Sequence, residues 1–244
     1  MRLRVLLCLA LIAACGHAAP QSLGVRDRYE VGEDPTIAVA IAEPSSTDAV
    51  LVITKPDGST VRRDVALGVA RTNIRFNTPG ERGHVPTFDA LGDYRVELRA
   101  NDAVLAQQEI RISIDRLTEI FSTDEIASFQ PVARYTRAKQ HKQTHWKTYG
   151  AVYEHTLGSG ARIEVLVEEP GDALAVAWKP YEEEGMLGVI ENNHVRFRER
   201  AGSVTASWVS GKRIVAMRAA TLDDFQRGFI AHFLARYPSD LHAL

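Results

Sequence analysis

The residues best suited to do chemistry lie in one basic segment near the middle of the chain. Between Ile126 and Tyr153 there is no acidic residue. The segment carries cations, histidines and aromatic rings at short spacing: Arg134, Tyr135, Arg137, Lys139, His141, Lys142, His145, Trp146, Lys147, Tyr149 and Tyr153. Cations interleaved with aromatic rings are typical of sites for phosphates, nucleic acid or polysaccharide. A solvated loop explains the same composition, so both interpretations stay open.

The histidines of this segment raise a metal hypothesis. His141 and His145 are four residues apart, which would place both imidazoles on one face of a helix, with His155 as a third ligand. On a strand the same spacing separates the two Cα atoms by about 13 Å, which is far for one metal ion. No glutamate follows His141, so the zinc-metalloprotease pattern is absent. We therefore expect no cofactor.

A second basic cluster has the two-residue period of a strand. Its members fall on one strand face: His194, Arg196, Arg198 and Arg200. Val195 and Phe197 would point the other way, into the protein. The stretch from Glu164 to Glu191 is rich in acids. The arginines therefore either pair with acidic side chains on neighbouring strands or form a face that binds an anion or a partner.

Length and composition limit the class of protein. The chain has 244 residues, a net charge of −2, 45% hydrophobic and 25% charged residues. These values fit one large or two ordinary globular domains and exclude a disordered, collagen-like or multi-span membrane protein. A near-neutral chain gives no general argument for binding nucleic acid, so no nucleic-acid partner is expected.

The first residues have the pattern of an export signal. Arg2 and Arg4 precede an apolar run that ends at Ala14. The run has about half the length that a membrane-spanning helix needs, so residues 1–14 are expected to be a signal peptide. Cys8 lies in the part that would be removed, which leaves Cys15 without an internal disulfide partner.

The end of this run, Ile12-Ala13-Ala14-Cys15, resembles the lipobox of bacterial lipoprotein precursors. The resemblance implies that Cys15 carries lipid and becomes the acylated N-terminus, followed by a tether over residues 15–22. Gly16 stands where aspartate would favour the inner membrane, so the resemblance implies an outer-membrane protein facing the periplasm. Two alternatives remain open: ordinary cleavage after Ala18, and Cys15 as an apolar filler of the leader.

Residues 23–114 have the pattern of a β-sandwich. Apolar residues alternate with polar or small ones in several short segments, and proline–glycine turns separate them. Leu91-Gly92-Asp93-Tyr94 resembles the tyrosine corner of immunoglobulin-like and fibronectin-like sandwiches, in which the tyrosine hydroxyl bonds upstream backbone. A plain half-buried strand tyrosine is the alternative. The resemblance implies an immunoglobulin-like sandwich without a disulfide.

The rest of the chain is expected to form a helical connection over residues 115–130 and an α+β domain over 131–244. Ser122 and Glu125 fit a capping box, and Pro131 would end that short helix. The α+β domain is predicted from further alternating segments, including a strand through Leu174, Val176 and Trp178 and a three-strand meander from Val195 to Ala216. The predicted fold is therefore mainly β, with α+β in its second half.

A C-terminal helix is expected to cover the antiparallel sheet of this α+β domain. Thr221 and Asp224 fit its cap and Pro238 its end. Its apolar stripe comprises Phe225, Phe229, Ile230, Phe233 and Leu234.

The sequence favours a non-catalytic role. No G-x-S-x-G, P-loop or dinucleotide fingerprint occurs. We expect a membrane-anchored cell-envelope lipoprotein that acts as a binding or assembly module for a protein or envelope-polymer partner. One alternative is a periplasmic metal-dependent or hydrolytic enzyme that uses residues 134–155. Another is an inhibitor or immunity lipoprotein.

Overall fold

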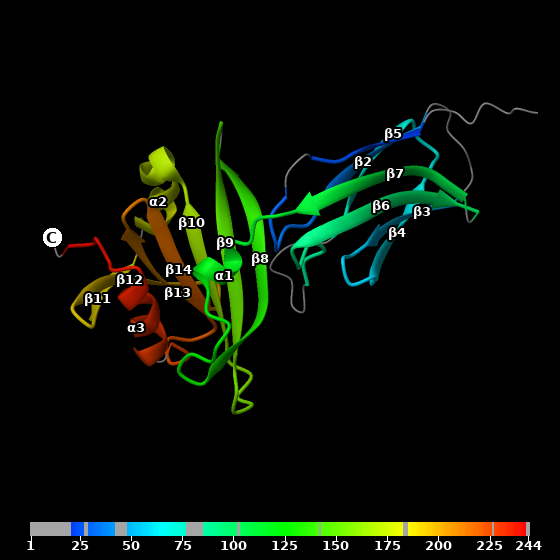
Figure 1. The fold of residues 1–244 in the computed structure, drawn as a ribbon. Coiled ribbons are helices and arrows are strands. Elements are labelled where there is room, and N and C mark those ends of the chain that lie inside the picture. Colours follow the sequence, from blue (N-terminus) through cyan, green and yellow to red (C-terminus); the bar gives the residue numbers. More distant parts are fainter. Residues whose placement is uncertain are drawn as a thin grey trace, which may run out of the picture.

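The computed structural model describes residues 21–26, 29–41, 48–76, 85–101, 103–141, 143–182, 185–225 and 227–242. Its strands form antiparallel sheets of three, four and seven strands, with a few short helices (Figure 1). The expectation of a mainly β chain is confirmed. The predicted signal peptide and Cys15 lie outside the described residues. Within the described ranges, no helix has the length and apolar character to cross a membrane.

The N-terminal half holds two sheets that share one core. The first has the order β1 (Gln21–Gly24), β2 (Thr36–Ile41), β5 (Arg71–Arg75). The second has the order β4 (Thr60–Ala66), β3 (Asp48–Thr54), β6 (Gly92–Ala100), β7 (Ala103–Ile112). Alternate residues of both sheets, such as Ile37 and Leu51, are fully buried in the same cluster. The core therefore lies between the two sheets.

Tyr94 makes the contact that its sequence context predicts. The side chain is buried, and its hydroxyl donates to the Ala90 carbonyl and accepts from the Ala90 N–H, each at 3.0 Å. Burial raises the pKa of Tyr94 to about 12, so the hydroxyl keeps the proton that it donates.

The predicted tether is too long at its C-terminal end. Gln21 and Ser22 already belong to β1, where they pair with Ile41 and Ala40. Backbone pairing to β2 satisfies the N–H and C=O groups of these residues, which a free tether would leave to water.

The C-terminal half is built on one seven-stranded sheet. Its order is β11 (Met186–Ile190), β12 (Asn193–Arg200), β13 (Ser203–Ser210), β14 (Arg213–Ala219), β10 (Arg162–Glu169), β9 (Thr144–His155), β8 (Phe129–His141). The predicted meander is confirmed as β12, β13 and β14, which are joined by short turns. The edge strand β8 lies next to the N-terminal half (Figure 1).

The sheet has two different faces. We call the face against α3 (Arg227–Arg236) the inner face and the opposite face the outer face. On the inner face the predicted apolar stripe of the C-terminal segment is buried, and Phe229 packs edge-on against Tyr153 with ring centroids 5.2 Å apart. α3 begins six residues later than Thr221. Thr221 and Asp224 still form a reciprocal capping pair, at 2.8 and 3.3 Å, but in the turn before the helix.

The outer face carries α2 (Leu174–Glu182), which follows a short 3₁₀ turn at Gly171–Ala173. This segment was expected to be a strand, and that prediction is wrong. The spacing of Leu174, Ala177, Trp178 and Tyr181 is helical, and these side chains pack with Trp146 and Ile214. The alanines that suggested alternation are strong helix formers, so the segment becomes a helix when one side of it can be buried.

The expected helical connection over 115–130 is also corrected. Its only described helix is α1 (Leu117–Ile120), which ends before Ser122. The N-cap residue of α1 is Arg116, and the carboxylate of Asp115, one residue earlier, accepts from the Thr118 N–H at 3.2 Å. Ser122 instead forms a local turn, in which its hydroxyl accepts from the Asp124 N–H at 3.0 Å. Pro131 ends no helix, because it lies within β8 at a register shift.

The two halves meet along β8 and β9 through close backbone contact. Gly32 has φ +90°, and its carbonyl accepts from the Thr136 N–H at 2.7 Å. A Cβ at Gly32 would collide with Leu117 and with the β8 backbone. Lys147 completes the junction with an ion pair to Glu30 at 2.5 Å.

Candidate functional site

The outer face brings together a column of hydroxyls and a row of arginines. Three alternate residues of β13 carry small hydroxyl side chains that point to this face: Ser203, Thr205 and Ser207. The same alternation on β12 gives Arg196, Arg198 and Arg200. The register sets Arg198 directly beside Thr205, and Arg218 of β14 on the other side of Thr205. Short side chains between long ones leave a hollow in the sheet surface.

This hollow, which we call the arginine trough, is a cavity of about 310 Å³. Its lining residues are Lys139, Pro180, Tyr181, Arg198, Arg200, Ala201, Ser203, Thr205, Ser207 and Arg218. Four of these residues are cations and none is an acid, so the cavity presents positive charge and hydrogen-bond donors. It is large enough for a small ligand or for one group of a larger one.

A fully buried carboxylate, Glu168, holds one wall of the trough in place. It accepts from Lys139 Nζ at 2.8 Å, from Trp146 Nε1 at 2.7 Å and from the Tyr181 hydroxyl at 2.7 Å. These three donors come from β8, β9 and α2. Burial, followed by the charge of Glu168, raises the pKa of Tyr181. Its hydroxyl therefore stays protonated and ties α2 to the sheet.

A second set of contacts beside the trough is organised around Gly150, on the same strands β8, β9 and β10. The Tyr135 ring lies flat over this glycine, where a Cβ would overlap the ring. The close approach lets the Tyr135 hydroxyl donate to Glu164, which also contacts Arg218 Nη1 at 3.4 Å. Burial, and then the charge of Glu164, raises the pKa of Tyr135. Glu164 therefore has a permanent hydrogen-bond donor on one side and positions Arg218 on the other.

Arg198 links the trough to the end of α2. Its Nη1 donates to the Pro180 carbonyl at 2.7 Å. A cation is favourable at this end of a helix, where carbonyl groups lack intrahelical partners. Arg200, one row further along β12, is exposed.

The structure joins two predicted clusters that lie far apart in the sequence. Lys139 comes from the segment 134–155, and Arg198 and Arg200 come from the cluster on β12. The expected pairing of β12 with acidic strands is wrong, because its neighbours carry Leu187, Val189, Thr205 and Ser207 at the paired positions. His194 and Arg196 share the outer face but do not line the trough. Both are half-buried.

The rest of the basic segment is dispersed. It is neither a loop nor a single surface, because it forms β8, β9 and the turn between them. Arg137 lies over the Tyr135 ring, and Lys147 belongs to the junction. The interleaved aromatic rings are buried and cannot stack on a ligand, which corrects that part of the expectation: Tyr135, Trp146, Tyr149 and Tyr153. Lys142 lies outside the described residues.

The three metal candidates do not meet. Cross-strand register puts His141 and His145 on opposite faces at the tip of the β8–β9 hairpin. His155 lies at the other end of β9, about 33 Å away for ten strand residues. Its ring packs against Phe129 at 5.0 Å. Within the described part of the chain, no group of three or more His, Cys, Asp or Glu residues is arranged to hold a metal ion.

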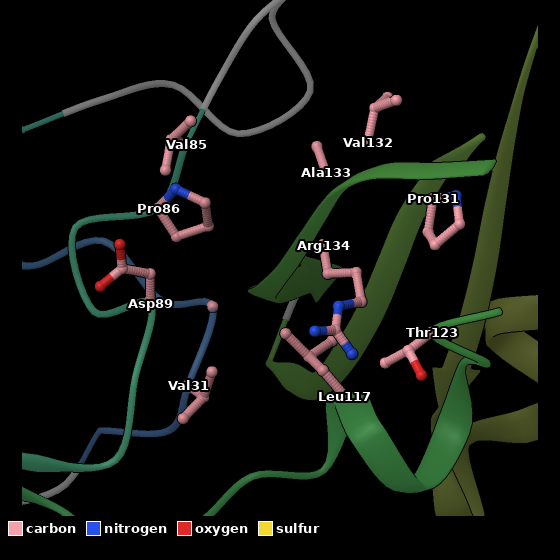
Figure 2. A pocket seen from close by; sticks show the side chains of 11 residues that line it. Val31, Val85, Pro86, Asp89, Leu117, Thr123, Pro131, Val132, Ala133 and Arg134 are labelled. Atoms are coloured by element: carbon pink, nitrogen blue, oxygen red, sulfur yellow. The ribbon is translucent and has the colours of Figure 1, made fainter. Parts of the chain in front are cut away.

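Arg134 lines a separate cavity of about 330 Å³ at the junction of the two halves. Figure 2 shows its guanidinium extending toward Leu117, with Val31 and Pro86 of the N-terminal half on the other side. Arg134 Nη1 is buried and has no hydrogen-bond partner among the described residues. This cavity is lined by one cation and one acid, Asp89, whereas the trough is lined by four cations and no acid.

Four residues that line the trough were not predicted from the sequence: Thr205, Ser207, Tyr181 and Arg218. The alternation Ser203-Val-Thr-Ala-Ser207 does place hydroxyls on one strand face, and that pattern could have drawn attention to β13. Tyr181 could not be found in this way, because the strand expected through Leu174, Val176 and Trp178 does not bring it to the outer face as the helix α2 does. No protein-family model matches the chain, and no curated protein matches it either.

Proposed function

We propose that this chain is a lipid-anchored cell-envelope protein that binds a protein or polymer partner through the arginine trough. One observation carries the proposal: residues from β8, α2, β12, β13 and β14 converge on one cavity that is lined by cations and hydroxyls and by no acid. Burying the Glu168 carboxylate beneath three donors costs desolvation free energy, and solubility of this face does not require it. The network therefore supports a binding role for the cavity.

The proposal includes the anchor and the type of N-terminal fold. Cys15 in its lipobox context supports lipid attachment and an outer-membrane location facing the periplasm. Seven strands in two sheets, with the Tyr94 hydroxyl bonded to Ala90, support an immunoglobulin-like sandwich. In this arrangement the sandwich would carry the seven-stranded sheet away from the membrane.

The anchor is tested by palmitate labelling of cells that express the wild type or Cys15→Ser, followed by membrane fractionation. We expect label and membrane association in the wild type and loss of both in Cys15→Ser. An unlabelled, soluble wild type would contradict lipid anchoring and favour cleavage after Ala18.

The binding surface is tested by site-specific photo-cross-linking in intact cells. A photoreactive amino acid replaces Ala201, which is exposed and lines the trough. The control position is Asp57, which is exposed in the turn between β3 and β4. We expect one discrete adduct from position 201 that is absent at position 57. Identical adduct patterns at both positions, or no adduct at position 201, would contradict binding through the trough.

A further inference from the structure

We infer that the arginine trough binds a phosphoryl group, as a phosphate monoester or diester carried by the partner or by a lipid headgroup. The inference rests on the proposed function, since it names the chemistry that the binding site recognises. It starts from one cross-strand row, in which Arg198, Thr205 and Arg218 are direct neighbours on β12, β13 and β14.

The geometry of this row suits an anion held between two walls. Neighbouring strands are about 4.8 Å apart, so the Cα atoms of Arg198 and Arg218 are about 10 Å apart with Thr205 midway. Long guanidinium side chains can close on a group from both sides, while the short threonine leaves room for it. One row along, Arg200 is paired with Ser203, which adds one more cation and one more hydroxyl on the β12 side.

The shape of the donor set favours phosphate over carboxylate. A carboxylate is planar, and the fork of a single arginine satisfies both of its oxygens. A phosphoryl group is tetrahedral, and its oxygens can reach Arg198, Arg218 and the hydroxyl of Thr205 at the same time. Donors on two walls and on the floor therefore match the tetrahedral group better.

The acids near the trough pair with two of its four cations, Glu168 with Lys139 at 2.8 Å and Glu164 with Arg218 at 3.4 Å, so the charge of Arg198 and Arg200 remains. Glu168 is buried beneath Lys139 and Tyr181, and Glu164 accepts from Tyr135 and Arg218. Neither carboxylate lines the cavity. Both hold donors in position without competing for the space that a ligand would take. Among the described residues, no carboxylate pairs with Arg198 or Arg200, so their charge is available to a ligand.

The test is calorimetric titration of the full-length lipidated protein in a non-ionic detergent with glycerol 3-phosphate, and with glycerate as the matched carboxylate. The trough variants are Arg198→Gln and Thr205→Val. The control is Arg111→Gln on the N-terminal half, where the arginine side chain is exposed opposite Asp93. Thermal melts of all variants check that they fold as the wild type does.

We expect saturable binding of glycerol 3-phosphate that is stronger than binding of glycerate. Loss of one charged hydrogen-bond donor should weaken the affinity of Arg198→Gln by about tenfold or more, with a smaller loss for Thr205→Val and none for Arg111→Gln. Equal affinity for glycerate, an equal loss in the control, or no saturable heat at about 10 mM ligand would overturn the inference.

A competition arm separates the two sources of phosphate. Mixed micelles of the same detergent with phosphatidylglycerol compete with glycerol 3-phosphate if the natural group is a lipid headgroup. They do not compete if it belongs to a soluble or polymeric ester. A discrete photo-cross-link from position 201 without any phosphate binding would leave the proposed function in place and remove only this inference.

Discussion

The two faces of the seven-stranded sheet use the same strands for different purposes. On the inner face, Val165 of β10, Trp208 of β13 and Met217 of β14 are buried in one apolar cluster. On the outer face, the intervening positions of the same strands carry Glu164, Thr205 and Arg218. Since side chains alternate along a strand, both surfaces follow from a single set of sequence patterns.

This difference teaches which face the fold requires. Apolar burial drives folding, and the inner face supplies it. Buried polar groups contribute less to the free energy of folding, and they destabilise the protein when they are incompletely paired. The polar outer face therefore stabilises the sheet less than an apolar face would. Substitutions on the inner face, then on the outer face, and then at the contacts that shape them should therefore differ in how much they destabilise the protein.

The largest effect is expected from Phe229→Asp on the inner face. The substitution removes a fully buried ring that contacts Tyr153 and Phe129 and places a carboxylate among apolar groups. Loss of a buried phenylalanine alone costs about 3–5 kcal/mol, and the buried charge adds to this cost. Urea denaturation should show a destabilisation of at least about 4 kcal/mol.

The matched control is Leu222→Asp, which adds the same carboxylate to a side chain that is 53% exposed. It should change the free energy of unfolding by less than about 0.5 kcal/mol. Similar losses in the two variants would mean that α3 does not seal the inner face.

The next effect is expected from Glu168→Ala on the outer face. Glu168 is 0% exposed, and its removal leaves Lys139, Trp146 and Tyr181 without their acceptor. Lys139 can turn to solvent, so we expect a loss of about 2–3 kcal/mol, below the range for fully buried pairs. Asp172→Ala is the control, because that carboxylate is 100% exposed and should contribute almost nothing. If Glu168→Ala lowers the free energy of unfolding as little as Asp172→Ala does, the Glu168 network does not stabilise the outer face.

Sequence patterns predict the parts of this fold that one strand or helix determines alone. The meander β12–β14 and the apolar stripe through Phe229 follow from local periodicity, and the contact of Tyr94 follows from the resemblance of its sequence context to a tyrosine corner. α2 was missed because leucine, valine and tryptophan alternating with alanine fit a strand as well as a helix. Only the apolar surface around Trp146 and Ile214 decides between the two.

The trough could be predicted only in part, for a similar reason. The period of β12 places its arginines on one face. Which strands flank them depends on the order of the sheet, and that order brings hydroxyls from β13 and Arg218 from β14. Lys139 reaches the cavity from β8, at the far edge of the sheet. Such convergence depends on tertiary structure and leaves no trace in local spacing.

A smaller effect is expected from Gly150→Ala, which tests how closely the outer face is packed. The added methyl group meets the Tyr135 ring, and overpacking of this kind costs about 1–2 kcal/mol. In a Tyr135→Leu background the cost should fall, and a double-mutant cycle measures the coupling. Gly68→Ala is the control, because a Cβ there meets nothing within 4 Å. Additive effects of the Gly150 and Tyr135 substitutions would contradict the contact.

The smallest effect concerns Glu33, a buried carboxylate at the junction that contrasts with Glu168. Glu33 is 4% exposed, and it accepts from Arg26 and from the Glu30 N–H, each at 3.2 Å, with Lys147 4.0 Å away. Burial outweighs these contacts and raises the pKa of Glu33 above its usual 4.5. The folded state therefore holds this proton to a higher pH than the unfolded state does.

It follows that Glu33 contributes stability below about pH 4.5 that is lost as the pH rises through its folded pKa. In urea denaturation between about pH 4 and pH 7, the free energy of unfolding of the wild type should fall relative to that of Glu33→Gln. Glu109→Gln, at an exposed position, should show no such trend. A difference between wild type and Glu33→Gln that stays constant or reverses with pH would mean that Arg26 and Lys147 outweigh burial. The junction would then resemble the paired outer face, where Glu168 has its full set of donors.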